Sequence, residues 1–202
     1  MTTCLVVFVS GNGSNLQAII DAIQAGEIDC RIALVVSNKP GVFALERARK
    51  AGIPSVVHTL KSYRDQGKTR IQYDIDLAAL VVDRIGKQPD IQVLAGFMHI
   101  LSADYLNKFK AGSVINLHPA LPGTFDGAKA IERAFTAFQE GKVTGTGVMV
   151  HRVIPQVDRG EPIILKQVPI YATDTVADLE TRIHSIEHAL LIAGIKLLLS
   201  HE

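Results

Sequence analysis

Short apolar runs rich in valine, isoleucine and leucine recur along this chain, and segments with helical spacing separate them. The runs do not alternate with polar residues, which is typical of parallel strands that are buried on both faces. Repeated strand–helix–strand alternation predicts an α/β fold, a doubly wound and mostly parallel sheet with helices on both faces. The predicted strands are 4–9, 32–36, 55–58, 90–95 and 113–117, and the predicted helices between them are 14–25, 41–51 and 69–85.

The pattern changes after Pro119, where a predicted helix over 128–140 leads to two longer strand-like runs, 147–154 and 162–171. We expect these runs to add antiparallel strands in the C-terminal third. A last helix is predicted to open at Asp174 as its N-cap. Its predicted apolar face consists of Leu179, Ile183, Ile186, Leu190 and Leu191, and that of the helix over 69–85 consists of Ile71, Ile75, Ala78, Leu80 and Val82.

The charges nearly cancel: 21 Lys and Arg stand against 20 Asp and Glu in 202 residues, a net charge of +1. This balance argues against a nucleic-acid partner, because binding a polyanion needs a basic surplus or stripe. The apolar stretch 189–199 contains Lys196 and is shorter than the roughly 18 residues of a membrane span. Two cysteines, Cys4 and Cys30, are expected to be buried thiols. We therefore expect a soluble, cytoplasmic protein without a membrane partner.

A glycine-containing turn, residues 10–15, joins the first predicted strand to the first predicted helix. Glycines permit close backbone approach, and a helix N-terminus offers unpaired N–H groups and the positive end of the dipole. Leu16 and Gln17 stand where a dinucleotide fingerprint has its third glycine, and the Gly-Lys-Ser/Thr of a P-loop is absent. The turn favours a monophosphate site, with a turn that binds nothing as the alternative.

Asn116 and His118 lie two residues apart at the end of the fifth predicted strand, so their side chains point to the same side. An amide donor beside an imidazole suits acyl transfer, because the amide stabilises an oxyanion and the imidazole moves protons. The alternative is a capping Asn and a structural His. Asp158, in a loop between the two last strands, is a candidate carboxylate that would raise the pKa of His118.

The last helix carries a different pattern, His184, Glu187 and His188, which matches the H-x-x-E-H arrangement of some zinc enzymes. No further cluster of candidate ligands supports it in the sequence. A partly exposed polar helix face is the favoured interpretation, and we expect no metal.

Several segments in order make the chain resemble the folate-dependent formyltransferase family, in its phosphoribosylglycinamide branch. The resemblance covers nearly the whole chain. It rests on the segments 10–17, 37–39, 45–48, 94–98, 116–119, 158–160 and 187–188.

The resemblance implies a single formyltransferase domain over 1–202, with a nucleotide-binding half at 1–118 and a catalytic and folate half at 119–202. It implies transfer of a formyl group from 10-formyltetrahydrofolate, a cosubstrate, to the amine of 5'-phosphoribosylglycinamide in purine biosynthesis. No tightly bound cofactor is implied. The expected partners are these small molecules, and the expected assembly is a monomer or homodimer.

The resemblance also implies roles for individual residues. Asn116 would stabilise the oxyanion, His118 would shuttle the proton, and Asp158 would favour the charged imidazole. The phosphate and ribose would bind to Gly13, Ser14, Asn15 and Glu187. The folate would bind to Arg70, Met98, His99, Ile100, Leu101 and Asn116.

Three features depart from the family pattern. His99 stands where many bacterial relatives have Arg, Lys129 stands where relatives have a His near the catalytic Asp, and the loop 120–127 has a fungal-like sequence. A lysine at 129 could still pair with Asp158. Two other functions stay open: a formyltetrahydrofolate hydrolase, and a non-catalytic module that binds a phosphate or nucleotide.

Overall fold

The structure, a computed structural model, describes residues 2–200. The chain divides into two compact units, Met1–Ile115 and Asn116–Glu202, and the division falls within one strand, β5 (Val114–His118). The division predicted from the sequence, after residue 118, falls close by. That the two halves form one domain stays a prediction.

The first unit is built on parallel strands in the order β3-β2-β1-β4, with β5 next in the order. Every residue of β1 from Cys4 to Val9 is buried, so both faces of this strand are covered as predicted. Cys4 and Cys30 are buried free thiols, also as predicted. The remaining bounds are β1 (Thr3–Val9), β2 (Cys30–Ser37), β3 (Ser55–Val57) and β4 (Ile91–Leu94).

The helices of the first unit form two groups. Helix α1 contacts α2, while α4 contacts α3 and α5, and a helix from each group contacts β2. Because β1 is buried on both faces, the two groups cover opposite faces of the sheet. Helices α3 and α5 were not predicted, since six and four residues are too few to show a helical period. The bounds are α1 (Ser14–Gln24), α2 (Phe43–Lys50), α3 (Leu60–Asp65), α4 (Arg70–Ile85) and α5 (Ala103–Leu106).

The predicted apolar face of α4 is wrong. Ile71 and Ile75 are 51% and 38% exposed, and only Ala78 of the predicted set is buried. The buried stripe includes a carboxylate, Asp74, which a hydrophobic pattern cannot reveal. Its members are Tyr73, Asp74, Leu77, Ala78 and Val81.

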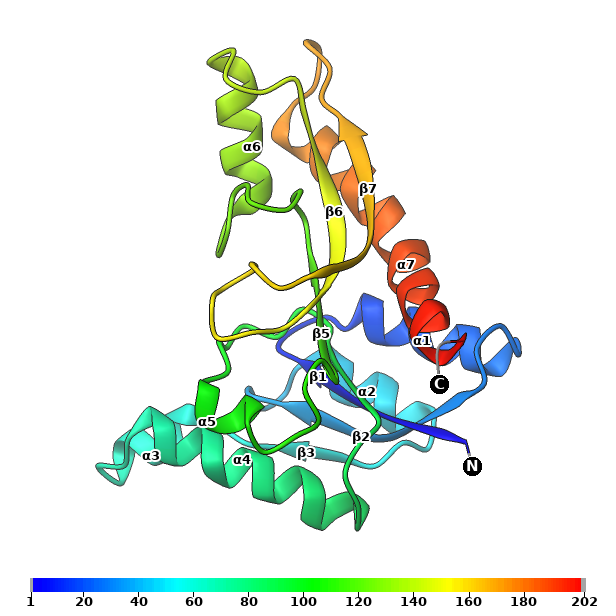
Figure 1. The fold of residues 1–202 in the computed structure, drawn as a ribbon, viewed down its shortest axis with the longest axis vertical. Coiled ribbons are helices and arrows are strands. Elements are labelled where there is room, and N and C mark those ends of the chain that lie inside the picture. The colour runs from blue at the N-terminus through cyan, green and yellow to red at the C-terminus, as the bar shows by residue number, and fades with distance from the viewer. Residues whose placement is uncertain (1, 201–202) are drawn as a thin grey trace. The chain divides into compact units, whose positions relative to one another are not determined.

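The second unit has strands in the order β5-β6-β7, and β6 and β7 pair antiparallel, which confirms the predicted antiparallel addition. Helices α6 and α7 both contact β6, and α7 also lies along β7 (Figure 1). The bounds are β6 (Gly145–Arg152), β7 (Pro162–Pro169), α6 (Ala130–Gln139) and α7 (Val176–Ser200).

The N-cap of α7 is Thr175, so the prediction of Asp174 is wrong by one residue. The Asp178 N–H donates to the Thr175 hydroxyl over 3.2 Å, and the Thr175 N–H donates to the Asp178 carboxylate over 2.8 Å. This reciprocal pair satisfies two backbone donors at the helix start. Asp174 instead accepts from the Tyr171 N–H and pairs with Arg182 at 2.7 Å.

Helix α7 extends well beyond the apolar stretch 189–199. Its 25 residues are long and apolar enough, with a mean hydropathy of 1.4 over an 18-residue window, to meet the composition test for a membrane span. The core helix of a soluble protein meets the same test. Leu179, Ile183, Leu190 and Leu191 are buried as predicted, Ile186 is half-buried, and the helix contacts β6 and β7.

A buried hydrogen bond between a carboxylate and an imidazole joins α4 to the chain after β4. The Asp74 carboxylate lies 2.6 Å from Nε2 of His99, and both side chains are almost inaccessible. The second oxygen of the same carboxylate accepts the Ser102 N–H over 2.9 Å. One buried carboxylate therefore holds the segment 99–102 at both ends.

We predict that Asp74→Asn lowers the free energy of unfolding by about 1–3 kcal/mol at about pH 7. Burial raises the pKa of Asp74, but the His99 and Ser102 donors outweigh it and hold this pKa below its usual value. A carboxylate with a lowered folded-state pKa stabilises the fold above its unfolded pKa of about 4, and this stabilisation is lost as the pH falls through the folded value. The difference from the native chain should therefore shrink in acid, as measured by urea unfolding over a pH series.

The matched control is Asp76→Asn, on the same helix, where the carboxylate is exposed and accepts the Tyr63 hydroxyl. This variant should stay within about 0.5 kcal/mol of the native chain. A loss for Asp74→Asn that stayed constant across the pH series would contradict the assigned role of its charge.

Candidate active site

The carboxyl ends of three parallel strands meet at one edge of the sheet in the first unit. The Ser10 hydroxyl, after β1, donates to Oδ1 of Asn38, after β2, over 2.6 Å. The Met98 N–H, after β4, donates to the same hydroxyl over 2.7 Å. Open α/β sheets bind ligands at this edge. Ser10, in the segment 10–17, therefore contacts two further segments on which the resemblance rests, 37–39 and 94–98.

The glycine turn packs against α2. Gly13 has φ +77°, and a Cβ placed on it would lie 2.6 Å from Cβ of Ala44, so both conformation and space require glycine there. Gly13 is also the N-cap of α1 and has no side chain to satisfy the first N–H groups of the helix. Ser14 is exposed and Asn15 is half-buried at this helix start. The turn thus leaves backbone donors of α1 available for an anion.

Arg47 is a residue at this turn to which the sequence analysis assigned no role. Its guanidinium donates to the carbonyl of Asn12 over 2.9 Å, and to the side chains of Asn12 and Gln17 over 3.0 Å each. In the sequence, the segment 45–48 supported only the family resemblance. No local pattern connects Arg47 with Asn12, because they lie 35 residues apart along the chain. A positive charge therefore lies beside the predicted anion site.

The predicted folate-binding segment presents two apolar side chains to solvent: Met98 is 73% exposed and Ile100 is 53% exposed. Leu101 is buried, and His99 points toward Asp74. Arg70, the first residue of α4, donates through its guanidinium to the Ile100 carbonyl. Hydrogen bonds with Asp74 and Arg70 therefore fix the backbone and side chains of this segment at residues 99, 100 and 102. Its binding of folate stays a prediction.

The predicted catalytic residues come together within the second unit. Asn116 and His118 lie at the end of β5, and Asp158 follows β6. Nδ2 of Asn116 donates to the Asp158 carboxylate over 3.2 Å, and Nδ1 of His118 lies 3.4 Å from the other oxygen of that carboxylate. The His118 and Asp158 side chains are 6% and 9% exposed. One shielded carboxylate therefore contacts both the amide and the imidazole.

A second histidine, His151 on β6, belongs to this cluster and was not predicted. Its Nε2 lies 3.2 Å from Nδ2 of Asn116 and 3.5 Å from Asp158. Its Nδ1 lies 2.8 Å from the Arg152 carbonyl, which can only accept, so Nδ1 carries a proton and Nε2 is the nitrogen that can accept the Asn116 N–H. The signal that could have found it is a histidine that directly follows the apolar residues 148–150 on a predicted strand.

Burial and charge oppose one another at His118. Burial, the larger effect, holds the pKa of His118 below its usual value, although the Asp158 carboxylate acts to raise it. Asp158 therefore acts on this pKa in the expected direction, but burial outweighs its effect. Burial also raises the pKa of Asp158, but its contacts with His151, the Gly127 N–H and His118 outweigh burial and lower that pKa. The cluster favours an ionised carboxylate beside a neutral imidazole.

The backbone around Asp158 is fixed by close packing. Asp158 has φ +54°, which is uncommon for a residue other than glycine. A Cβ on Gly160 would lie 1.7 Å from the Arg152 carbonyl oxygen, so only glycine lets this loop pass so close to the end of β6. Close packing against β6 thus explains why glycine is required at position 160 in the segment 158–160.

Two predicted side chains lie outside this cluster of contacts. Glu187, on α7, is largely buried, and burial raises its pKa against the opposing effect of His184 at 4.0 Å. Lys129 is exposed at the N-cap of α6, while the side chains that face the Asp158 carboxylate include the imidazoles of His118 and His151. Within residues 2–200, no group of three or more His, Cys, Asp or Glu side chains is arranged to hold a metal ion.

Comparison with known proteins identifies the family of this chain. Residues 4–195 match the formyl transferase family. The chain is 48% identical to a phosphoribosylglycinamide formyltransferase of Schizosaccharomyces pombe, with 96% of each chain covered. It is 38% identical to the Escherichia coli protein of that name, with 92% of this chain and 82% of that one covered.

Solved structures show the same likeness. A glycinamide ribonucleotide transformylase from Symbiobacterium toebii superposes with a TM-score of 0.88 at 34% identity, covering 99% of this chain and 89% of that one. A phosphoribosylglycinamide formyltransferase from Bacillus halodurans gives a TM-score of 0.88 at 33% identity, covering 98% and 96%. On its fold and over nearly its whole length, the chain belongs to the formyl transferase family.

Proposed function

We propose that this chain transfers the formyl group of 10-formyltetrahydrofolate to the amine of 5'-phosphoribosylglycinamide, a step of purine biosynthesis. The observation that carries the proposal is the contact cluster of Asn116, His118 and Asp158. The substrates are suggested by relatives named phosphoribosylglycinamide formyltransferase that match nearly the full chain.

In the proposed reaction the substrate amine attacks the formyl carbon directly. The lowered pKa of His118 leaves its imidazole neutral near pH 7. With Nδ1 protonated beside the Asp158 carboxylate, Nε2 is the nitrogen that accepts the proton lost by the attacking amine. Asp158 then stabilises the imidazolium, which returns the proton to the departing folate nitrogen as the carbon–nitrogen bond breaks. The products are the formylated amide and tetrahydrofolate.

Asn116 is the proposed oxyanion donor. Both N–H bonds of its amide already have acceptors, the Asp158 carboxylate and Nε2 of His151. The carboxylate keeps the nitrogen, rather than the oxygen, directed into the cluster, because a carboxylate can only accept. A developing oxyanion would replace the His151 nitrogen as the second acceptor, and a hydrogen bond to a charged oxygen is stronger.

Substrate binding is assigned to the remaining predicted residues. Gly13, Ser14 and Asn15 bind the phosphate through the start of α1, with the Arg47 charge nearby, and Glu187 binds the ribose hydroxyls. The folate binds to Arg70, Asn116 and the segment 98–101. The folate is a cosubstrate in this scheme, and no tightly bound cofactor takes part.

We further infer that the protein acts in the cytoplasm on small molecules, as a monomer or homodimer, without a nucleic-acid or membrane partner. The net charge of +1 supports binding of a single phosphate and not of a polyanion.

Turnover with both substrates is the first test of the function. The purified protein should release tetrahydrofolate from 10-formyltetrahydrofolate when phosphoribosylglycinamide is present, as followed by absorbance. Equal release without the nucleotide would identify a hydrolase instead. Binding of the nucleotide by calorimetry without any release would identify a non-catalytic module.

Gly13→Ala should raise KM for the nucleotide by roughly tenfold or more, equivalent to about 1.4 kcal/mol, since the new Cβ forces the turn away from α2. Gly26→Ala is the matched control: φ is +71° there too, but nothing lies within 4 Å of the added Cβ. Both variants pay the conformational cost of a left-handed alanine, so both lose stability. An unchanged nucleotide KM in a folded Gly13→Ala protein would argue against the phosphate site.

Asn116→Ala should lower kcat by about 10²–10³-fold, the usual cost of losing an oxyanion donor. Asn107→Ala, which removes an exposed amide at the end of α5, should leave kcat unchanged. Melting temperatures of both variants show whether the fold is intact. A near-native kcat for Asn116→Ala would return this residue to a structural role.

A further inference from the structure

A short loop before α6 has an unusual backbone. Phe125 has φ +50° and Lys129 has φ +57°, so two residues with side chains adopt the left-handed conformation that favours glycine. Such residues persist only where their surroundings hold them, and they gather at functional sites. The segment 125–129, called here the 125–129 loop, lies within the second unit.

This loop contacts two members of the catalytic cluster through its backbone. The Gly127 N–H donates to the Asp158 carboxylate over 2.8 Å. The Phe125 carbonyl lies 3.3 Å from Nε2 of His118, on the opposite side of the ring from the nitrogen that faces Asp158. The position of the loop therefore determines how both side chains are held.

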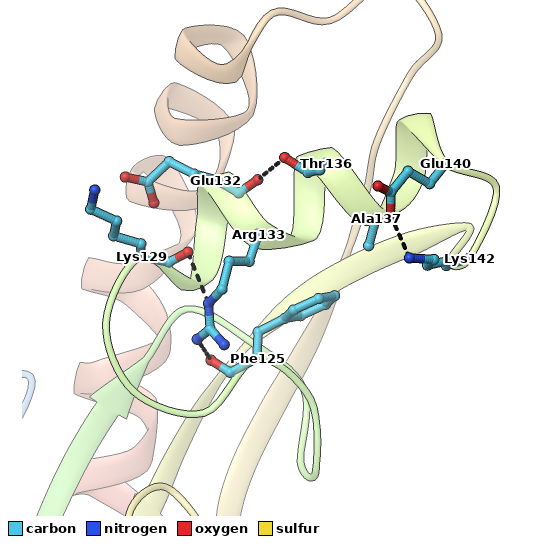
Figure 2. Close-up of a pocket in the computed structure, with 8 residues that line it drawn as sticks. All are labelled: Phe125, Lys129, Glu132, Arg133, Thr136, Ala137, Glu140 and Lys142. Atoms are coloured by element: carbon cyan, nitrogen blue, oxygen red, sulfur yellow. Dashed lines mark hydrogen bonds and ion pairs between the residues drawn. The ribbon is translucent and has the colours of Figure 1, made fainter.

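Arg133, on the first turns of α6, holds the loop in turn. One terminal nitrogen of its guanidinium donates to the carbonyls of Phe125 and Asp126, over 2.6 Å each, and its Nε lies 3.4 Å from the Lys129 carbonyl. Figure 2 shows the side chain extending from α6 between the two ends of the loop. Two of the three carbonyls belong to the left-handed residues. The guanidinium thus bridges both strained positions.

We propose that Arg133 is a positioning residue for the catalytic cluster, acting through the 125–129 loop on Asp158 and His118. The catalytic part of this inference rests on the proposed function. The chain of contacts runs from the guanidinium to the Phe125 carbonyl and His118, and through Asp126 and Gly127 to Asp158.

The chemistry of arginine fits this role better than that of lysine. A planar guanidinium presents several N–H groups in a fixed fork, so it can bind three carbonyls from one position. An ammonium is a point charge on a flexible stem and would hold fewer of them. A second tether, the ion pair of Arg159 with Asp126 at 2.5 Å, leaves the loop attached when Arg133 is changed. Changing Arg133 should therefore displace the loop without unfolding the unit.

Three variants test the proposal by steady-state kinetics: Arg133→Ala, Arg133→Lys, and Glu132→Ala as the control. Glu132 is the neighbouring exposed residue, and in Figure 2 its carboxylate extends away from the Arg133 guanidinium. Arg133→Ala should lower kcat by roughly ten- to a hundredfold with both KM values within about twofold, because misplacement affects the chemical step. The kcat of Arg133→Lys should lie between those of Arg133→Ala and the native chain. The kcat of Glu132→Ala should equal that of the native chain.

A second measurement needs no turnover. The imidazole ¹⁵N resonances of His118, assigned with a His118→Gln variant, should shift in Arg133→Ala and less in Arg133→Lys, while those of His58 in the first unit stay unchanged. If the native protein proves inactive, this measurement still tests the contact chain. Unchanged His118 resonances in folded Arg133→Ala would overturn the proposal, and so would shifted resonances with a native kcat.

Discussion

The carboxylate of Asp158 is the group on which the second unit's cluster depends. Its two oxygens accept from the Asn116 amide and the Gly127 N–H, and they face His118 and His151. A buried carboxylate is costly unless it is paired and hydrogen-bonded, so these partners must stay in place for it to remain ionised. The left-handed backbone at Asp158 and the glycine at 160 serve the same requirement, since they bring the loop against β6.

The first unit solves a different electrostatic problem. A chain with a net charge of +1 can still bind a phosphate, because the start of α1 supplies unpaired N–H groups where Gly13 replaces a capping side chain. Arg47 adds local charge, but its guanidinium is also fixed to Asn12 and Gln17. Hydrogen bonds therefore fix the position of the positive charge at this turn, and the composition of the chain does not reveal it. Net charge argues against a polyanionic partner, but it does not predict whether a single anion binds at a local site.

The sequence predicted those features whose cause is local. Apolar runs identified the strands, and a two-residue spacing brought Asn116 and His118 to one side of β5. Contacts between distant segments left no such trace: His151 lies 35 residues from Asn116, and Arg47 lies equally far from Asn12. The face of α4 was wrong for a related reason, since its buried Asp74 is explained only by His99, 25 residues away. A polar residue in a core has a partner that periodicity cannot identify.

The pKa of His118 shows why residue identity alone does not give the net direction of a pKa shift. A nearby carboxylate stabilises an imidazolium, but this effect competes with the loss of solvent around a ring that is 6% exposed. Which effect is larger depends on how completely β5, the 125–129 loop and the Asp158 loop enclose the ring. For proton transfer the outcome is favourable, because a general base must be neutral before it accepts a proton. Once the proton has been transferred, the Asp158 carboxylate stabilises the positive charge of the imidazolium, which burial alone would disfavour.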